Sequence, residues 1–161
     1  MMGIHTISVL VENNSGALSR ISGLFSSRGY NISSLTVAET DDPTVSRMTI
    51  VVDGEETILE QIFKQLNRLI DVIKVIDFQG EPVVEREMVL VKIDSNHSNR
   101  HEMVGLGTIF GAKVASVAPS SITFEMMGTR SIINDFINMI KPYGIKEIVR
   151  SGTIAIGQSR K

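Results

Sequence analysis

Residues 4–39, IHTISVLVENNSGALSRISGLFSSRGYNISSLTVAE, decide the fold of the first half of the chain. Apolar residues alternate along 4–11, which is the period of a half-buried strand. The cluster ENNSG then interrupts the alternation with turn and cap residues. Leu18, Ile21 and Phe25 follow at helical spacing, and Gly29 takes the position of a glycine that ends a helix. The β-branched residues after it predict a second strand, so the stretch indicates strand, helix and strand.

The next residues complete the pattern of one small α/β unit. Residues 46–52 alternate between apolar and polar, which predicts a third strand. Asp53 and Glu56 resemble a capping box for an amphipathic helix over 58–70. Residues 72–78 predict a fourth strand. The order strand, helix, strand, strand, helix, strand is that of a ferredoxin-like domain.

The second half of the chain repeats this order without residue-level identity. Residues 79–87, QGEPVVERE, hold Gly, Pro and four charged residues and are interpreted as a linker. The elements expected after it are a strand at 88–93, a helix over 99–111 weakened by Gly105 and Gly107, a hairpin of 113–117 and 122–126, a helix that stops near Pro142, a strand at 145–149 and a tail from 151. The sequence therefore predicts an α+β fold of two ferredoxin-like βαββαβ domains, residues 1–80 and 81–161.

Length and composition agree with this fold and exclude several function classes. A chain of 161 residues, 42% hydrophobic and 21% charged, suits two ordinary globular domains. Its formal charge of −2 and its 5% aromatic content give no attraction to nucleic acid and few stacking platforms. The absence of cysteine excludes disulfides and thiol nucleophiles. No signal-like start and no apolar run of about 20 residues is found, so we expect a cytoplasmic protein without a membrane partner.

Catalytic and metal-binding patterns are poorly represented. His97 and His101 are four residues apart, so a helix would place them on one face with Glu102 nearby. A structural metal site usually needs four ligands, so an exposed polar helix start is favoured and metal binding by this pair is the alternative. The segment GLGTIFG, residues 105–111, lacks both phosphate-loop motifs, and its glycines more simply relieve packing or mark a broken helix. No nucleophile has a base at a recognisable spacing, so we expect no catalysis.

The loop after the first strand is the candidate binding site. Asn13, Asn14 and Ser15 offer hydrogen-bonding groups, and Gly16 precedes a helix whose unpaired amides and positive dipole end suit a carboxylate. Gly16 would let a ligand approach the backbone closely, and Asn31 can both donate and accept hydrogen bonds. These groups would suit a zwitterionic amino acid. Simple N-capping by Asn14 or Ser15 is the alternative.

The same residues carry a resemblance to a known family. The stretch from Val9 to Ile50, with ENNSGALSR, GLFSSRGYNISSLTV and TDDPTVSRMTI, closely resembles the start of the regulatory (small) subunit of acetolactate synthase, also called acetohydroxyacid synthase. The resemblance continues through VVEREMVLVKI and IKEIVRSGTIAIGQSRK and is weakest over 95–112. It implies an ACT domain at residues 1–80 and a second ferredoxin-like regulatory domain at 81–161.

The resemblance also implies that this chain is not an enzyme. The family's catalytic (large) subunit is a separate protein that uses thiamine diphosphate, Mg²⁺ and FAD to condense pyruvate with pyruvate or 2-oxobutyrate in branched-chain amino-acid synthesis. The small subunit raises that activity and confers feedback inhibition, usually by valine. Family ACT domains pair into a homodimer and bind the amino acid at its interface. Carried over, effector contacts fall on Asn13, Gly16, Ala17 and Leu18 of one chain, on Asn31 and Ile32 of its partner, and on Ala38 in the wall.

Two other function classes stay open on the residues alone. A stand-alone amino-acid-binding module, such as a transcription regulator, is disfavoured because no helix-turn-helix or basic recognition helix is found. A metal-responsive ferredoxin-like regulator would depend on His97 and His101. The sequence does not choose among valine, leucine and isoleucine, because pocket size separates such ligands by only about 1–3 kcal/mol per methylene.

Overall fold

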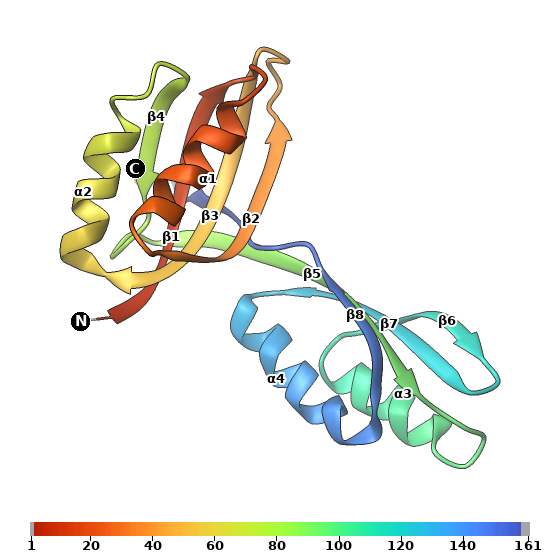
Figure 1. Cartoon of the computed structure of the whole chain (residues 1–161). Coiled ribbons are helices and arrows are strands. Elements are labelled where there is room, and N and C mark those ends of the chain that lie inside the picture. Colours follow the sequence, from red (N-terminus) through yellow and green to blue (C-terminus); the bar gives the residue numbers. More distant parts are fainter. Residues whose placement is uncertain (1, 159–161) are drawn as a thin grey trace. The chain divides into compact units, whose positions relative to one another are not determined.

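The computed structural model describes residues 2–158 and divides them into two compact units. The first unit holds residues 2–84 together with 153–158, and the second holds residues 85–152 (Figure 1). The α+β class and the two βαββαβ units are confirmed. The units differ from the predicted domains in two respects: the first extends to Val84, and the segment from Thr153, interpreted as a tail of the second domain, belongs to the first unit.

In the first unit, helices α1 and α2 pack on one face of an antiparallel sheet with the strand order β2-β3-β1-β4 (Figure 1). Its elements are β1 (Met2–Glu12), α1 (Ala17–Ser27), β2 (Asn31–Glu39), β3 (Val45–Glu55), α2 (Glu56–Leu66) and β4 (Val72–Asp77). Alternating residues of β1 and β3, such as Ile7 and Ile50, pack against Ile21 and Phe25 of α1 and Ile62 of α2. The strands β2 and β4 are therefore the two edges of this sheet.

Helix α2 does not begin at the predicted capping box. Asp53 lies inside β3, where it pairs with Asn31 of β2, and the N-cap residue is Glu55, whose side chain makes no capping hydrogen bond. The strand continues through Gly54 and Glu55 because β1 pairs with both. The Tyr30 ring lies against Gly54, where a Cβ would stand 1.9 Å from it. The Tyr30 hydroxyl donates a hydrogen bond to the Glu55 carbonyl at 2.8 Å. Pairing with β1, which extends to Glu55, therefore places the start of this helix after the predicted cap.

The second unit repeats the arrangement with the strand order β6-β7-β5-β8. Its elements are β5 (Val83–Asp94), α3 (Arg100–Ile109), β6 (Lys113–Ala118), β7 (Ser121–Gly128), α4 (Arg130–Ile140), the 3₁₀ turn η1 (Lys141–Tyr143) and β8 (Ile145–Arg150). Because β5 begins at Val83, the predicted linker 79–87 is wrong in its second half. The predicted hairpin and the helix end before Pro142 are confirmed. Among the described residues, no helix is long and apolar enough to cross a membrane.

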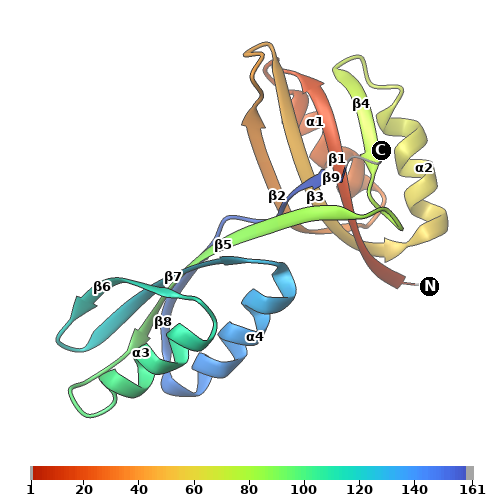
Figure 2. The ribbon, with the colours of Figure 1, turned by 180° about the vertical axis from the view of Figure 1, so that it is seen from behind.

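The segment that follows β8 returns to the first unit and forms the short strand β9 (Ile154–Gly157), which pairs with β5. It lies on the face of the first sheet that α1 and α2 leave open (Figure 2). Arg47 Nη2 donates a hydrogen bond to the Ala155 carbonyl at 3.1 Å, and the Thr153 N–H donates one to Ser34 Oγ at 3.3 Å. Thr153 and Ala155 are buried. The supposed tail is thus a packed part of the first unit.

Candidate amino-acid site at the start of helix α1

The loop between β1 and α1 presents the start of α1 without a side-chain cap. Gly16 is the N-cap residue, with φ 88° and ψ −11°. This left-handed conformation explains the glycine, because other residues adopt it at a cost. At the start of α1, no side chain of the described residues makes a capping hydrogen bond, so N-capping by the Asn14 or Ser15 side chain is wrong. The first N–H groups of a helix lack partners within it, and at α1 the Ala17 N–H donates to the Asn14 carbonyl at 3.3 Å. The N–H groups that follow are the backbone donors at the predicted carboxylate position.

Polar side chains fix this loop to the end of the neighbouring strand. Asn13 Nδ2 donates hydrogen bonds to Glu39 Oε1 and to the Pro43 carbonyl, both at 3.1 Å. Asn14 Nδ2 donates to Glu12 Oε2 at 3.1 Å. Both asparagine side chains therefore bind within the chain itself: Asn13 holds the loop at the end of β2, and Asn14 holds the end of β1.

An ion pair that the sequence analysis missed ties the loop to the segment before β4. Arg20 Nε and Nη2 lie 2.7 Å and 2.6 Å from Asp71 Oδ2, and the Asp71 side chain is only 11% exposed. The Asp71 carbonyl accepts a hydrogen bond from the Glu12 N–H at 2.8 Å. The guanidinium folds back over the loop, so that a Cβ on Gly16 would stand 2.9 Å from Arg20 Nη1. Arg20 is one helical turn after Gly16, but no local pattern indicates a partner 51 residues away.

The structure does not bring Asn31 and Ile32 to this loop within one chain. Asn31 begins β2, whereas Glu39, which is bonded to Asn13, ends it. Eight residues of extended chain span about 26 Å, so the two ends of the strand are far apart. Asn31 is exposed and Ile32 is half-buried.

The remaining predicted residues differ in exposure. Ala17 is buried under the start of α1. Leu18 stands at helical spacing from Ile21 and Phe25 but is 46% exposed, so it does not share their buried face. Ala38 is exposed on β2, opposite Arg47 in the register. Leu18 and Ala38 are therefore apolar side chains that a ligand or a partner could reach.

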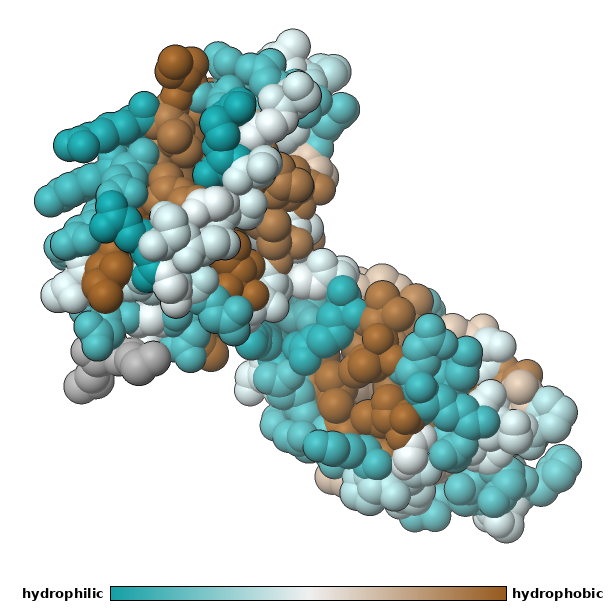
Figure 3. Space-filling model, viewed as in Figure 1, coloured by the Kyte–Doolittle hydropathy of each residue, from teal (hydrophilic) through white to brown (hydrophobic). Residues whose placement is uncertain are grey.

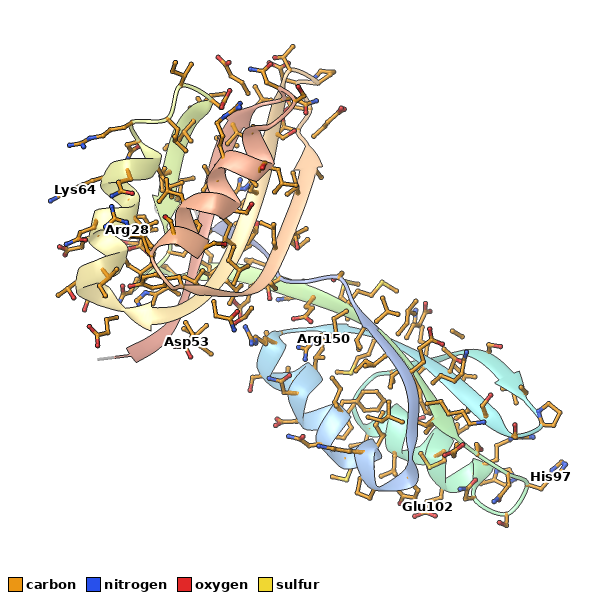
Figure 4. The ribbon with its side chains drawn as sticks, viewed as in Figure 1. Arg28, Asp53, Lys64, His97, Glu102 and Arg150 are labelled. Atoms are coloured by element: carbon orange, nitrogen blue, oxygen red, sulfur yellow. The ribbon has the colours of Figure 1, made fainter. Side chains whose placement is uncertain are left out.

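The predicted histidine pair does not share a helix. His97 lies in the turn before Asn99, the N-cap residue of α3, and it points away from the chain and from Glu102 (Figure 4). Glu102 Oε1 accepts a hydrogen bond from the Tyr143 hydroxyl at 2.6 Å, and this bond raises the pKa of that hydroxyl. Within the described part of the chain, no group of three or more His, Asp or Glu residues could hold a metal ion. The metal alternative has no geometric support there.

Comparison with known proteins identifies the family. Residues 7–74 match the AHAS small subunit-like ACT domain, and residues 86–159 match the small subunit of acetolactate synthase. The chain is 48% identical over 156 residues to the acetolactate synthase small subunit of Haemophilus influenzae, with 96% of each chain covered. It is 45% identical to the probable acetolactate synthase small subunit of Archaeoglobus fulgidus, with 98% of each covered. The chain belongs to the acetolactate synthase small-subunit family.

A crystal structure supports the same assignment for the fold. The acetolactate synthase small subunit from Thermotoga maritima matches with a TM-score of 0.88 and 36% identity over 99% of both chains. The first unit is thus an ACT domain, and the resemblance seen in the sequence is confirmed. A small, regulatory subunit of acetolactate synthase implies a large catalytic subunit as its partner.

Proposed function

We propose that this acetolactate synthase small subunit activates the catalytic subunit and makes it sensitive to feedback inhibition by valine or another branched-chain amino acid. The amino acid would bind between the ACT domains of two copies of the chain. The proposal rests on one observation: Asn31 and Ile32 lie at the end of β2 that is far from the loop before α1, so a single chain does not bring the candidate residues together. The proposed contacts are Asn13, Gly16, Ala17 and Leu18 of one protomer and Asn31, Ile32 and Ala38 along β2, with Asn31 and Ile32 from the partner.

The edge strand β2 explains how two copies would complete the site. One side of β2 pairs with β3, and no strand among residues 2–158 pairs with the other side. A second copy adding its own β2 antiparallel across a two-fold axis would set its Asn31 beside Glu39 of the first copy. Because Asn13 is bonded to Glu39, the loop of one protomer and Asn31 of the other would meet. The symmetry would generate two such sites in each dimer.

The chemistry of the two halves suits a small apolar amino acid. The start of α1 and its backbone donors favour a carboxylate by about 0.3–1 kcal/mol, and more when partly buried. The Asn31 amide oxygen can accept hydrogen bonds from an ammonium group. Leu18 and Ala38 offer apolar surface for an aliphatic side chain. A charged or strongly polar side chain would find no partner among these residues.

Feedback inhibition then needs only a modest coupling between the two proteins. The amino acid must favour one arrangement of the dimer interface, and that arrangement must fit the catalytic subunit differently. Tenfold inhibition corresponds to about 1.4 kcal/mol, which a few differential hydrogen bonds can supply. On this proposal, thiamine diphosphate, Mg²⁺ and FAD belong to the large subunit, and both subunits work in the cytoplasm.

The variant Gly16→Asp tests the site. It sets a carboxylate where the ligand carboxylate would lie, so calorimetry on the chain alone should show valine affinity reduced about tenfold or more, or ~1.4 kcal/mol. Gly80→Asp is the matched control, because Gly80 also has a positive φ, 72°, and its Cβ would meet nothing within 4 Å. The control carries the same charge and a similar backbone strain outside the site. Equal valine affinity in the two variants contradicts the site assignment.

The variant Asn31→His tests the contribution of the partner. It should weaken valine binding while sedimentation still shows a dimer; loss of the dimer would make Asn31 structural instead. Reconstitution with an acetolactate synthase large subunit, with and without valine, tests the function itself. An unstimulated large subunit that valine does not inhibit would refute the proposal.

A further inference from the structure

The loop between α2 and β4 exposes an apolar side chain at its tip. Ile70 is 93% exposed, the highest fraction among the large apolar side chains that the structure describes. Ile73, at the start of β4, is also exposed. Figure 3 shows apolar surface at this loop, next to the hydrophilic surface of α2. Nothing in the described chain packs on Ile70, so its apolar surface is available to another protein.

Exposed cationic side chains lie close to this apolar tip along the chain. Arg68 lies in the loop and Lys74 lies on β4. Lys64 is exposed too, but it projects outward from the side of α2 (Figure 4). Arg20 and Arg68 line an open pocket of about 410 Å³ together with Leu69, Ile70 and Asp71. Asp71 is committed to Arg20, and Glu12, the neighbouring carboxylate, is held by Asn14. The surface thus combines an apolar projection with a recess in which two arginines face one carboxylate, so that Arg68 is the cation left for a carboxylate of a partner.

We propose that residues 67–74, with Arg20, form the docking loop for the catalytic subunit of acetolactate synthase. The partner surface would have an apolar recess for Ile70 and acidic side chains facing Arg20 and Arg68. The identification of the partner as the catalytic subunit is the part of this proposal that rests on the proposed function. A partner with that charge is favoured because complementary potentials steer encounter and set specificity.

A second copy of this chain fits the docking loop less well than the catalytic subunit does. A two-fold contact through the loop would bring Arg20 and Arg68 of one copy against the same residues of the other. The proposed dimer uses β2, which is the opposite edge of the sheet from β4, so the loop stays accessible in it. The loop is also bonded to the proposed effector loop, through Arg20 and Asp71 and through the Glu12 N–H.

The variant Ile70→Glu tests the docking loop on the full chain. Because Ile70 is almost fully exposed, thermal unfolding and valine binding by the chain alone should not change. Its affinity for a purified large subunit, measured by surface plasmon resonance, should fall about tenfold or more, as for a truncated interface hot spot. Ile109→Glu is the matched control, since Ile109 is 77% exposed on α3 of the second unit. That control should bind the large subunit with unchanged affinity.

The variant Arg68→Glu tests the charge argument separately. It should slow association with the large subunit and reduce the dependence of the association rate on ionic strength. Unchanged affinity and association rate in both Ile70→Glu and Arg68→Glu overturn the docking proposal. A smaller oligomeric mass for Ile70→Glu with unchanged affinity overturns it too, because the loop would then join copies of this chain. Absence of valine binding by the unmodified chain would refute the effector site and leave the docking result intact.

Discussion

Two glycines of α3, two residues apart, allow side-chain packing to be measured against helix propensity. Gly107 is buried, and a Cβ on it would stand 2.5 Å from Cε1 of the Phe124 ring. Phe124 is itself buried, and its ring packs edge-on against Phe136 with centroids 5.8 Å apart. A Cβ on Gly105 would meet nothing within 4 Å. The same substitution is therefore made once at an exposed position and once at a buried position in contact with Phe124.

The two substitutions should change the unfolding free energy in opposite directions. Gly105→Ala should stabilise the second unit by about 0.5–1 kcal/mol, because alanine loses less backbone entropy on folding into a helix. Gly107→Ala makes a similar gain at most, and overpacking against Phe124 should cost about 1–3 kcal/mol. The two variants should thus differ by about 1–3 kcal/mol in unfolding free energy. For a unit of this size, each kcal/mol corresponds to about 4–8 °C in melting temperature.

Differential scanning calorimetry on the full chain measures this difference. The two units can unfold in separate transitions. The comparison therefore uses the transition whose melting temperature changes in both variants. Only the difference in melting temperature between the two variants is interpreted. A double variant should melt close to the sum of the two shifts if the positions act independently. If Gly107→Ala melts at or above Gly105→Ala, the Phe124 ring has room to move, and the packing role assigned to Gly107 is refuted.

Two further predictions concern local contacts of the structure. Thr129 accepts a hydrogen bond from the Ile132 N–H at 3.3 Å as the N-cap of α4, so Thr129→Ala should lower the stability of the second unit by about 1 kcal/mol, seen as a lower melting temperature. An unchanged melting temperature would show that the cap contributes nothing in solution. Burial first, and then the charge of Glu55, raise the pKa of the Tyr30 hydroxyl, and the hydrogen bond to Glu102 raises that of Tyr143. The stability that these shifts contribute is complete below the ordinary pKa of 10.0 and is lost as pH rises through the folded values, so ultraviolet titration should place tyrosinate formation above 10.0, and a midpoint at or below it refutes the assignment.

Local patterns predicted most of the elements, and a distant contact defeated one of them. The alternation along β1 and the helical spacing of Ile21 and Phe25 are fixed by the geometry of single elements, so sequence alone predicts them. The start of α2 follows instead from the pairing of β3 with β1, which extends to Glu55. No signal near Asp53 reveals that pairing, and the local resemblance to a capping box was therefore misleading.

The candidate site likewise combines features that local sequence predicts with features that depend on distant contacts. Gly16 was singled out for close approach of a ligand, and the structure gives a local reason for glycine there, its left-handed conformation at the N-cap. The ion pair of Arg20 with Asp71 could not be predicted, since 51 residues separate its members. The segment of Thr153 and β9 escaped prediction for a similar reason: its hydrogen bonds with Arg47 and Ser34 join residues 108 and 119 positions apart. Asn31 and Ile32 were assigned as partner contacts through family resemblance, and the single chain keeps them at the far end of β2.

Asp71 gives the two proposals a common physical basis. Its carbonyl holds the Glu12 N–H, and its carboxylate holds the Arg20 guanidinium, which lies over Gly16. A ligand carboxylate at Gly16 would attract the same guanidinium that Asp71 binds, and any shift of Arg20 changes the charge presented by the pocket beside Ile70. Linkage requires the effect to be reciprocal. A large subunit bound at the docking loop must therefore change the affinity for valine by the same factor by which valine changes the affinity for the large subunit. Coupling between effector and catalytic partner would then run through one ion pair at the surface of the ACT domain and would leave the core of its sheet unchanged.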